Sequence, residues 1–419
     1  MADPTAPARR GPGALPGGDL PSTFWWLFAG MLVNALASFV FPFLALFLTS
    51  RGFSAARAGL VVAAYGGGSV LAGPVAGALA DRIGRRPTLL GSLLAGSGLT
   101  AMLAFVEGPA AIAAAALALG LVTHAFRPAA HAIVADVVPP GRRGHALGLL
   151  YWANNLGMAI ALVLGGAIAS RGYGALFLAD AATTLAFAVL AWWRVPETRP
   201  ALAGAVSSSA GPGERGAAGY REVLSDRAFL AFTLLNVVFL LPFLQFQVAL
   251  PVDMARHGLS PADFGRVLAV NGFLIALVQP WAAPLARRFD PSHVLAAACG
   301  LVGLGYGAYA FASAAPGYAG ATAVWSLGEI ICVPVAGALV ADFSPPHLRG
   351  RYQGAFTVSW GAAMLLAPAL GGALLERFGA PVLWASCLAV ELLVGTAHLA
   401  LAPSRRRALA ATSAPAESG

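Results

Sequence analysis

The chain has 419 residues, of which 58% are hydrophobic and only 11% are charged. Soluble domains carry about 25% charged residues, so this composition excludes a water-soluble enzyme and indicates an integral membrane protein. The formal net charge is +8, and arginine supplies every Lys/Arg charge because the sequence contains no lysine. The arginines lie in short clusters between apolar runs, so we attribute them to membrane topology and expect no binding of nucleic acid.

Charged residues, prolines and glycines divide the sequence into apolar segments of the length that a membrane-spanning helix needs, about 20 residues. We predict twelve such helices, at residues 23–49, 57–80, 88–107, 110–135, 145–169, 174–194, 229–252, 263–286, 292–313, 318–341, 350–374 and 380–402. The first run is too long for the core of a signal peptide, so we expect it to be retained as a helix.

These segments predict an all-α integral membrane protein with twelve transmembrane helices in two six-helix bundles. The expected parts are a disordered cytoplasmic N-terminus (1–21), an N-terminal bundle (22–194), a cytoplasmic central loop (195–228), a C-terminal bundle (229–402) and a disordered cytoplasmic tail (403–419). Most arginines fall in the loops on one side, so the positive-inside rule places both termini in the cytoplasm. We expect a multi-pass protein of the cell (inner) membrane.

The two halves repeat at a fixed offset of 206 residues. Asp136 aligns with Asp342, Pro128 with Pro334, and the pair Gly165-Gly166 with Gly371-Gly372. A shared spacing of charged, proline and glycine positions is not expected from unrelated apolar helices. We therefore predict two bundles in the same orientation, related by an axis along the membrane normal, which is a known transporter architecture.

The loop between the second and third predicted helices carries a specific motif. It reads Gly77-Ala-Leu-Ala-Asp81-Arg82-Ile-Gly84-Arg85-Arg86-Pro87. This motif closely resembles the loop signature of the major facilitator superfamily, and the resemblance extends through twelve helices, two halves and a long central loop. It implies alternating access around a cavity lined by the first, fourth, seventh and tenth helices.

The same resemblance implies a cytoplasmic charge latch. Asp81 would face the N-terminus of a helix, where a negative charge is favoured, and Arg85 and Asp136 would complete the latch. In the second half, Arg287 stands where the acid would be, which leaves Asp342 to pair with Arg287 or its neighbour. The alternative interpretation is that these charges only anchor the topology.

The fifth predicted helix contains a glycine pattern. It consists of Gly148, Gly157, Gly165 and Gly166. The spacing resembles the antiporter motif of twelve-helix drug:proton exporters, except that Ala161 and Leu162 replace its central Gly-Pro. The alternative interpretation is close helix packing through small residues, which membrane bundles commonly use.

Ionisable side chains inside membrane helices are costly and therefore mark candidate functional sites. Glu329 lies in the middle of the tenth helix, where the superfamily resemblance predicts a cavity-facing role in proton or cation binding. Arg127, in the fourth helix, shares a face with His124 and His131 and could bind an anionic substrate or pair with another helix. Neither charge has a counterpart at its repeat position.

Two further acids are weaker candidates for proton coupling. Asp180 lies near the outer end of the sixth helix and Glu391 in the middle of the twelfth, and the resemblance implies that both helices are peripheral. We interpret Asp180 as mainly structural and leave the role of Glu391 open. The polar and aromatic cavity candidates are Asn34, Gln245, Gln247 and Trp325.

The sequence thus predicts a bacterial secondary active transporter that exports amphiphilic small molecules in exchange for protons and functions as a monomer in the lipid bilayer. One alternative is a proton symporter or facilitator that imports a nutrient such as a sugar or organic acid. Another is a membrane receptor or scaffold that does not transport. No phosphate-binding glycine loop or metal-ligand cluster occurs, so we expect no enzymatic activity, no cofactor and no metal.

Overall fold

The computed structural model describes residues 20–139, 142–198, 221–286, 288–345 and 348–413, and within these ranges every regular element is a helix. The N-terminal half consists of α1 (Ser22–Ala35), α2 (Val40–Ser50), α3 (Ala55–Arg82), α4 (Arg85–Leu103), α5 (Pro109–Val137), α6 (Arg143–Ala169) and α7 (Tyr173–Arg194). The C-terminal half consists of α9 (Arg227–Phe243), η2 (Leu244–Gln247), α10 (Ala249–Arg256), α11 (Pro261–Ala286), α12 (Pro291–Ala308), η3 (Tyr309–Phe311), α13 (Ala315–Phe343), α14 (Arg349–Phe378), α15 (Ala380–Ala400) and α16 (Ala402–Ser413).

Most of these helices have the length and apolarity of membrane spans. Among the described residues, eleven helical segments are long and apolar enough to cross a bilayer. The predicted third crossing corresponds to α4, a 19-residue helix that begins with Arg85 and Arg86 and packs against α5 and α7. With α4, the helices follow the twelve predicted segments in order.

Two predicted spans are interrupted rather than continuous. The first breaks between the end of α1 at Ala35 and the start of α2 at Val40. The seventh breaks after Phe243, next to Pro242, where the chain forms the 3-10 turn η2 before α10. Both breaks lie beside the cavity described below, and each exposes backbone groups that a continuous helix would satisfy internally.

The tail expected to be disordered from residue 403 instead begins with α16. Arg405 holds this helix in place: its guanidinium donates to Ser292 Oγ at 3.1 Å and to His398 Nδ1 at 3.0 Å, and it lies over the ring of Phe232. The Arg405 residue is only 5% exposed. The sequence predicted a disordered tail here, whereas one of its arginines is buried against the C-terminal bundle.

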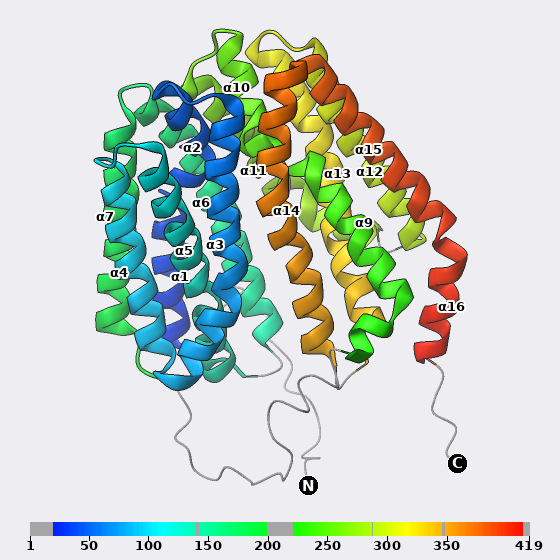
Figure 1. Cartoon of the computed structure of the whole chain (residues 1–419). Helices are drawn as coiled ribbons and strands as arrows, with labels where there is room; N and C mark the ends of the chain where they lie inside the picture. The colour runs from blue at the N-terminus through cyan, green and yellow to red at the C-terminus, as the bar shows by residue number, and fades with distance from the viewer. Residues whose placement is uncertain (1–19, 140–141, 199–220, 287, 346–347, 414–419) are drawn as a thin grey trace, which may run out of the picture.

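Figure 1 shows the two bundles, with α3 and α14 adjacent between them and with the start of α1 and the end of α16 at the same end of the molecule. We call that end the terminal side. The bundles contact each other through α3 with α14 and α6 with α11. A Cβ atom at Gly59 would lie 2.3 Å from the carbonyl oxygen of Pro368, and one at Gly265 would lie 2.1 Å from that of Leu162.

These two contacts are related by the 206-residue repeat, since Gly59 aligns with Gly265 and Leu162 with Pro368. A second pair obeys the same offset: a Cβ at Gly372 would lie 2.4 Å from the carbonyl oxygen of Ala55, and one at Gly166 would lie 2.7 Å from that of Pro261. Glycine is required at these positions because backbone approaches backbone. These four glycine contacts lie in the halves of α3, α6, α11 and α14 that are farther from the terminal side. The bundles are therefore closed at the end opposite the terminal side.

Candidate functional site

A cavity of about 380 Å³ lies between the two bundles. The breaks in the first and seventh crossings contribute Ser38 and Gln247, and helices α5 and α13 contribute residues of the fourth and tenth crossings. Aromatic side chains form much of its wall: Phe41, Tyr65, Phe126, Phe243, Phe246, Trp325 and Trp360. A cavity of this size and lining suits a largely apolar small molecule with few polar groups.

Glu329 of α13 lines this cavity, as the sequence predicted. Its Oε2 accepts a hydrogen bond of 2.6 Å from the side-chain amide of Asn271 in α11, and the same amide nitrogen donates to Ser326 Oγ at 3.0 Å. Among the described residues Glu329 forms no ion pair. The Asn271 partner was not singled out from the sequence, because an asparagine in a neighbouring apolar helix carries no spacing signal of its own.

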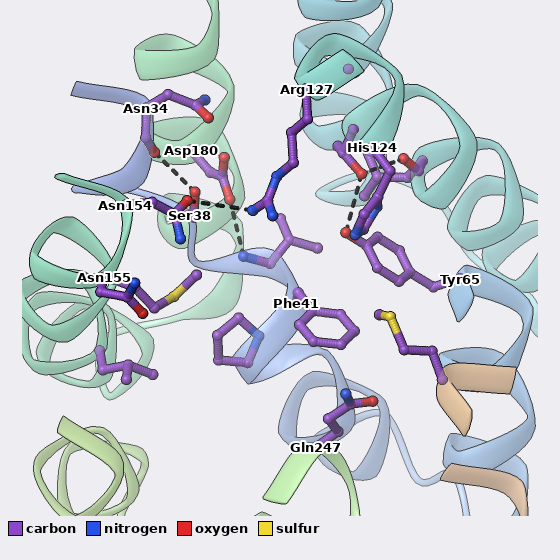
Figure 2. Close-up of a pocket in the computed structure, with 18 of the residues that line it drawn as sticks. Asn34, Ser38, Phe41, Tyr65, His124, Arg127, Asn154, Asn155, Asp180 and Gln247 are labelled. Atoms are coloured by element: carbon purple, nitrogen blue, oxygen red, sulfur yellow. Dashed lines mark hydrogen bonds between the residues drawn. The ribbon is translucent and has the colours of Figure 1, made fainter. Parts of the chain in front are cut away.

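Arg127 of α5 also lines the cavity, on the opposite bundle. Its guanidinium donates one long hydrogen bond, 3.4 Å, to Oδ1 of Asn154 in α6. Figure 2 shows the side chain extended into the cavity between Asp180 on one side and His124 on the other. His124 is turned to the Gly120 carbonyl, 3.2 Å from Nδ1, and its ring lies edge-on to that of Tyr65.

Asp180 of α7 has a structural partner that the sequence did not reveal. Its Oδ2 accepts from the backbone N–H groups of Phe39 and Val40, at 2.8 and 3.0 Å, and its Oδ1 accepts from Thr184 Oγ1 at 3.5 Å. The carboxylate therefore caps the N-terminus of α2 at the break in the first crossing, where a negative charge is favoured. This contact agrees with a mainly structural interpretation of Asp180.

The four predicted cavity contacts separate into two groups. Asn34, Gln247 and Trp325 line the cavity, but Gln245 does not. Gln245 instead donates to the carbonyl oxygens of Leu241 and Ala367, at 2.8 and 3.0 Å, and so joins η2 to α14. Trp325 donates its Nε1 to Tyr309 Oη at 2.7 Å, so it offers the cavity an aromatic ring rather than an N–H group.

On the terminal side, the structure brings together part of the predicted latch. Arg85 Nε lies 2.9 Å from Asp136 Oδ2, and Thr198 Oγ1 donates to the same carboxylate at 2.8 Å. The carboxylate of Glu197, which the sequence analysis did not identify, accepts from the backbone N–H groups of Arg85 and Arg86 at 3.1 Å each. Glu197 thereby caps α4 by the same principle as Asp180 caps α2.

Glycine is required at position 84 in this cluster for two reasons. Its φ angle is +110°, and a Cβ there would lie 2.4 Å from Glu197 Oε2. Arg82 ends α3, whereas the surroundings of Gly77 and the side chain of Asp81 lie outside what the structure describes. Asp342 is exposed, and its expected partner Arg287 is likewise outside the described residues.

The sequence profile of the Major Facilitator Superfamily matches residues 26–252 and 245–418. This chain belongs to the major facilitator superfamily. The chain is 26% identical over 382 residues to the uncharacterized MFS-type transporter YttB of Bacillus subtilis, covering 89% of this chain and 94% of that protein. It is 24% identical over 333 residues to the multidrug resistance protein MdtH of Aeromonas salmonicida, covering 79% and 82%.

Solved structures support the same fold. A crystal structure of the nucleoside transporter NupG superimposes with a TM-score of 0.76 at 12% identity, covering 91% of this chain and all of that one. An identity this low bears on the fold alone. The chain is accordingly a multi-pass membrane transporter of the superfamily and not an enzyme, and the superfamily resemblance drawn from its loop motif is confirmed.

Within this superfamily fold, three of the four glycines of the antiporter-like pattern in α6 stand at close contacts. A Cβ at Gly157 would lie 2.5 Å from that of Ala35 at the end of α1, and one at Gly165 would lie 2.8 Å from the rings of Phe39 and Phe43. Gly166 makes the contact with α11 described above. Gly148 has no atom within 4 Å of such a Cβ, so packing gives no reason for glycine there.

Glu391 of α15 does not line the cavity. It is 0% exposed, and neither carboxyl oxygen has a hydrogen-bond partner among the described nitrogen and oxygen atoms. Its Cβ lies where a side chain on Gly303 of α12 would otherwise fit, 2.9 Å from the position of a Cβ there. The structure thus separates Glu391 from Glu329 as a site: one faces the cavity and the other is enclosed between helices of the C-terminal bundle.

Proposed function

We propose that this superfamily transporter exports amphiphilic small molecules in exchange for protons. The observation that supports this most directly is Glu329, a carboxylic acid that faces an aromatic cavity and has an amide, not a cation, as its partner. Such a group can hold a proton or face a cationic substrate, but it cannot do both at once. Mutual exclusion of proton and substrate at one carboxylate is the logic that an exchanger requires.

The aromatic wall supports the choice of an amphiphilic cargo. Phe243 packs edge-on against Trp325 and Trp360, with ring centroids 5.7 and 6.2 Å apart, and Phe41 stacks on Tyr65 at 4.8 Å. These rings come from both bundles, so an apolar body between them contacts each half. The distant relationship to the multidrug resistance protein MdtH is in keeping with the same cargo class.

We further propose that the terminal side faces the cytoplasm of a bacterial cell, with both termini inside. The arginine clusters, including Arg85 and Arg86, lie on that side. In this orientation the bundle contacts at Gly59 and Gly265 close the outer end, as in an inward-facing state, and we propose that the protein functions as a monomer. Transport then requires the N-terminal (22–194) and C-terminal (229–402) bundles to rock until these outer contacts open.

The test is proton-coupled flux in proteoliposomes that contain the purified protein and a pH-sensitive dye. A panel of apolar cations, apolar acids and neutral aromatic compounds is added under an imposed proton gradient. Exchange predicts that a transported compound and protons move in opposite directions. Movement in the same direction would establish a symporter, and binding without movement of either would establish a receptor.

A further inference from the structure

The cavity contains three charged side chains among the described residues: Arg127, Asp180 and Glu329. The oxygens of Asp180 are occupied by the backbone amides of α2 and by Thr184. Glu329 has its Asn271 amide at 2.6 Å. Arg127 has five N–H donors, yet it makes one 3.4 Å hydrogen bond, to the neutral amide of Asn154.

Arg127 differs from other arginines that the structure describes. Arg85 lies 2.9 Å from Asp136, Arg266 lies 2.7 Å from Asp263, and Arg406 lies 3.2 Å from Asp290. Within the described ranges Arg127 has no such carboxylate. The Arg127 side chain is exposed and lines the cavity, and an arginine within a membrane bundle commonly marks a substrate pathway. Its vacant donors are therefore accessible to an anionic group of the substrate.

The two cavity side chains that can still take a charged partner, Arg127 and Glu329, lie on different bundles. Arg127 belongs to α5 and Glu329 to α13, and the same cavity is lined by Phe41 and Tyr65, whose rings stack at 4.8 Å. Figure 2 shows Arg127 approaching the cavity from the side opposite Phe41 and Gln247. A molecule with two charges of opposite sign and a flat apolar body would satisfy both groups and contact both halves of the protein.

We propose that the substrates are zwitterionic amphiphiles, whose anionic group binds the guanidinium of Arg127 and whose cationic group pairs with the carboxylate of Glu329. A planar oxyanion such as a carboxylate matches the fork of the guanidinium and accepts two parallel hydrogen bonds. This inference rests on the proposed function, because it assigns the cationic half of the substrate to the exchanging acid. It adds a second anchor, in the N-terminal bundle, that exchange alone does not need.

The two anchors also have a conformational consequence. A substrate held by Arg127 on one bundle and by Glu329 on the other links the two bodies that rock during transport. A molecule that carries one of the two charges forms an ion pair with one bundle and contacts the other bundle through its rings alone. The zwitterion is therefore expected to bind more tightly than either singly charged analogue.

The test is a set of four matched probes built on one naphthalene ring: 6-(aminomethyl)-2-naphthoic acid, its methyl ester, its N-acetyl derivative and the N-acetyl methyl ester. They are a zwitterion, a cation, an anion and a neutral molecule of similar shape. Affinities are measured by calorimetry on purified protein in detergent, with no gradient. A charge-assisted hydrogen bond is worth about 1.5–3 kcal/mol, so each correct charge is expected to tighten binding roughly 10- to 100-fold.

Variants assign each charge to its residue. Arg127→Gln should abolish the advantage of the free carboxylate and keep that of the amine, whereas Glu329→Gln should do the reverse. Arg127→Lys should keep part of the carboxylate advantage, since a point charge replaces the planar fork. Arg171→Gln and Glu107→Gln, in loops at the end opposite the terminal side, are the matched controls and should change nothing.

Retained binding of the neutral probe shows that a variant cavity is folded. If Arg127→Gln does not fold, the smaller carboxylate advantage expected of Arg127→Lys carries the test. The inference is overturned if the wild type binds the cation as tightly as the zwitterion, or if Arg127→Gln keeps the carboxylate advantage. Because the probes report equilibrium binding, absence of proton-coupled flux in proteoliposomes would overturn the exchange mechanism without altering this result.

Discussion

Asp180 provides a quantitative test of the first broken crossing. Replacing it with alanine removes the acceptor of the Phe39 and Val40 backbone N–H groups, at 2.8 and 3.0 Å. The Asp180 residue is 8% exposed, so water does not readily replace the lost acceptor. The Phe39 N–H keeps a second acceptor, the Ala37 carbonyl oxygen at 2.8 Å, so the Val40 N–H is the donor left unsatisfied. An unsatisfied buried donor costs about 1–3 kcal/mol, which is the loss predicted in the free energy of unfolding.

Asparagine separates the acceptor from the charge. Asp180→Asn keeps one carbonyl oxygen for both N–H groups, so only the charge–helix contribution, about 0.3–1 kcal/mol, should be lost. Unfolding is measured in detergent for both variants and for Thr183→Ala, whose hydroxyl bonds to the Asp180 carbonyl within the same helix. The capping role would be refuted if Asp180→Ala were as stable as Thr183→Ala, or if Asp180→Asn were as unstable as Asp180→Ala.

Three further predictions concern the outer contact and α16. Gly265→Val places a side chain against the Leu162 carbonyl, 2.1 Å from the Cβ position, and should raise cysteine labelling of α3 and α11 from the end opposite the terminal side. The control Gly91→Val, whose Cβ would have no atom within 4 Å, should not raise it. Unchanged labelling in Gly265→Val would show that this contact does not close the outer end. Arg405→Ala removes the hydrogen bonds to Ser292 and His398 and should speed hydrogen exchange in α16, whereas the control Arg407→Ala should not. Equal exchange rates in the wild type and both variants would exclude docking of α16 through Arg405. Despite partial burial, the amides of Ser292 and His293 and the charge of Arg406 hold the pKa of Asp290 below its ordinary value. The stabilisation of α16 through the Arg406–Asp290 ion pair is therefore present at neutral pH and is lost as pH falls through that lowered pKa. Asp290→Asn should remove this acid dependence from the hydrogen exchange of α16, and a pH profile identical to that of the wild type would contradict the prediction.

The sequence predicted the helices and their order because a membrane span needs a long apolar run that is visible in composition. The superfamily resemblance of the loop motif implied that Arg85 and Asp136 would be neighbours, and they form an ion pair of 2.9 Å. The glycine contacts at positions 59 and 265 follow the same repeat. The helices and the repeat are encoded locally or by periodicity, so one chain is enough to find them.

The features that escaped prediction depend on contacts between distant parts of the chain. The break after Ala35 is stabilised by a carboxylate from α7, about 140 residues away along the sequence, and Glu197 caps α4 from beyond the end of α7. Arg405 was assigned to a disordered tail because its buried partners lie in other helices. Gln245 was assigned to the cavity by polarity, although its amide serves the backbone of α14.

Substrate-induced proton release from Glu329 tests the central claim most directly. Tetraphenylphosphonium, an apolar cation with no exchangeable proton, is added to purified protein in weakly buffered detergent, and the pH change is recorded for the wild type, Glu329→Gln and the enclosed-acid control Glu391→Gln. The exchange mechanism predicts proton release from the wild type and from Glu391→Gln, and none from Glu329→Gln. The Glu329→Gln variant should still bind tetraphenylphosphonium, although more weakly than the wild type does. Equal release from the wild type and Glu329→Gln would contradict the account.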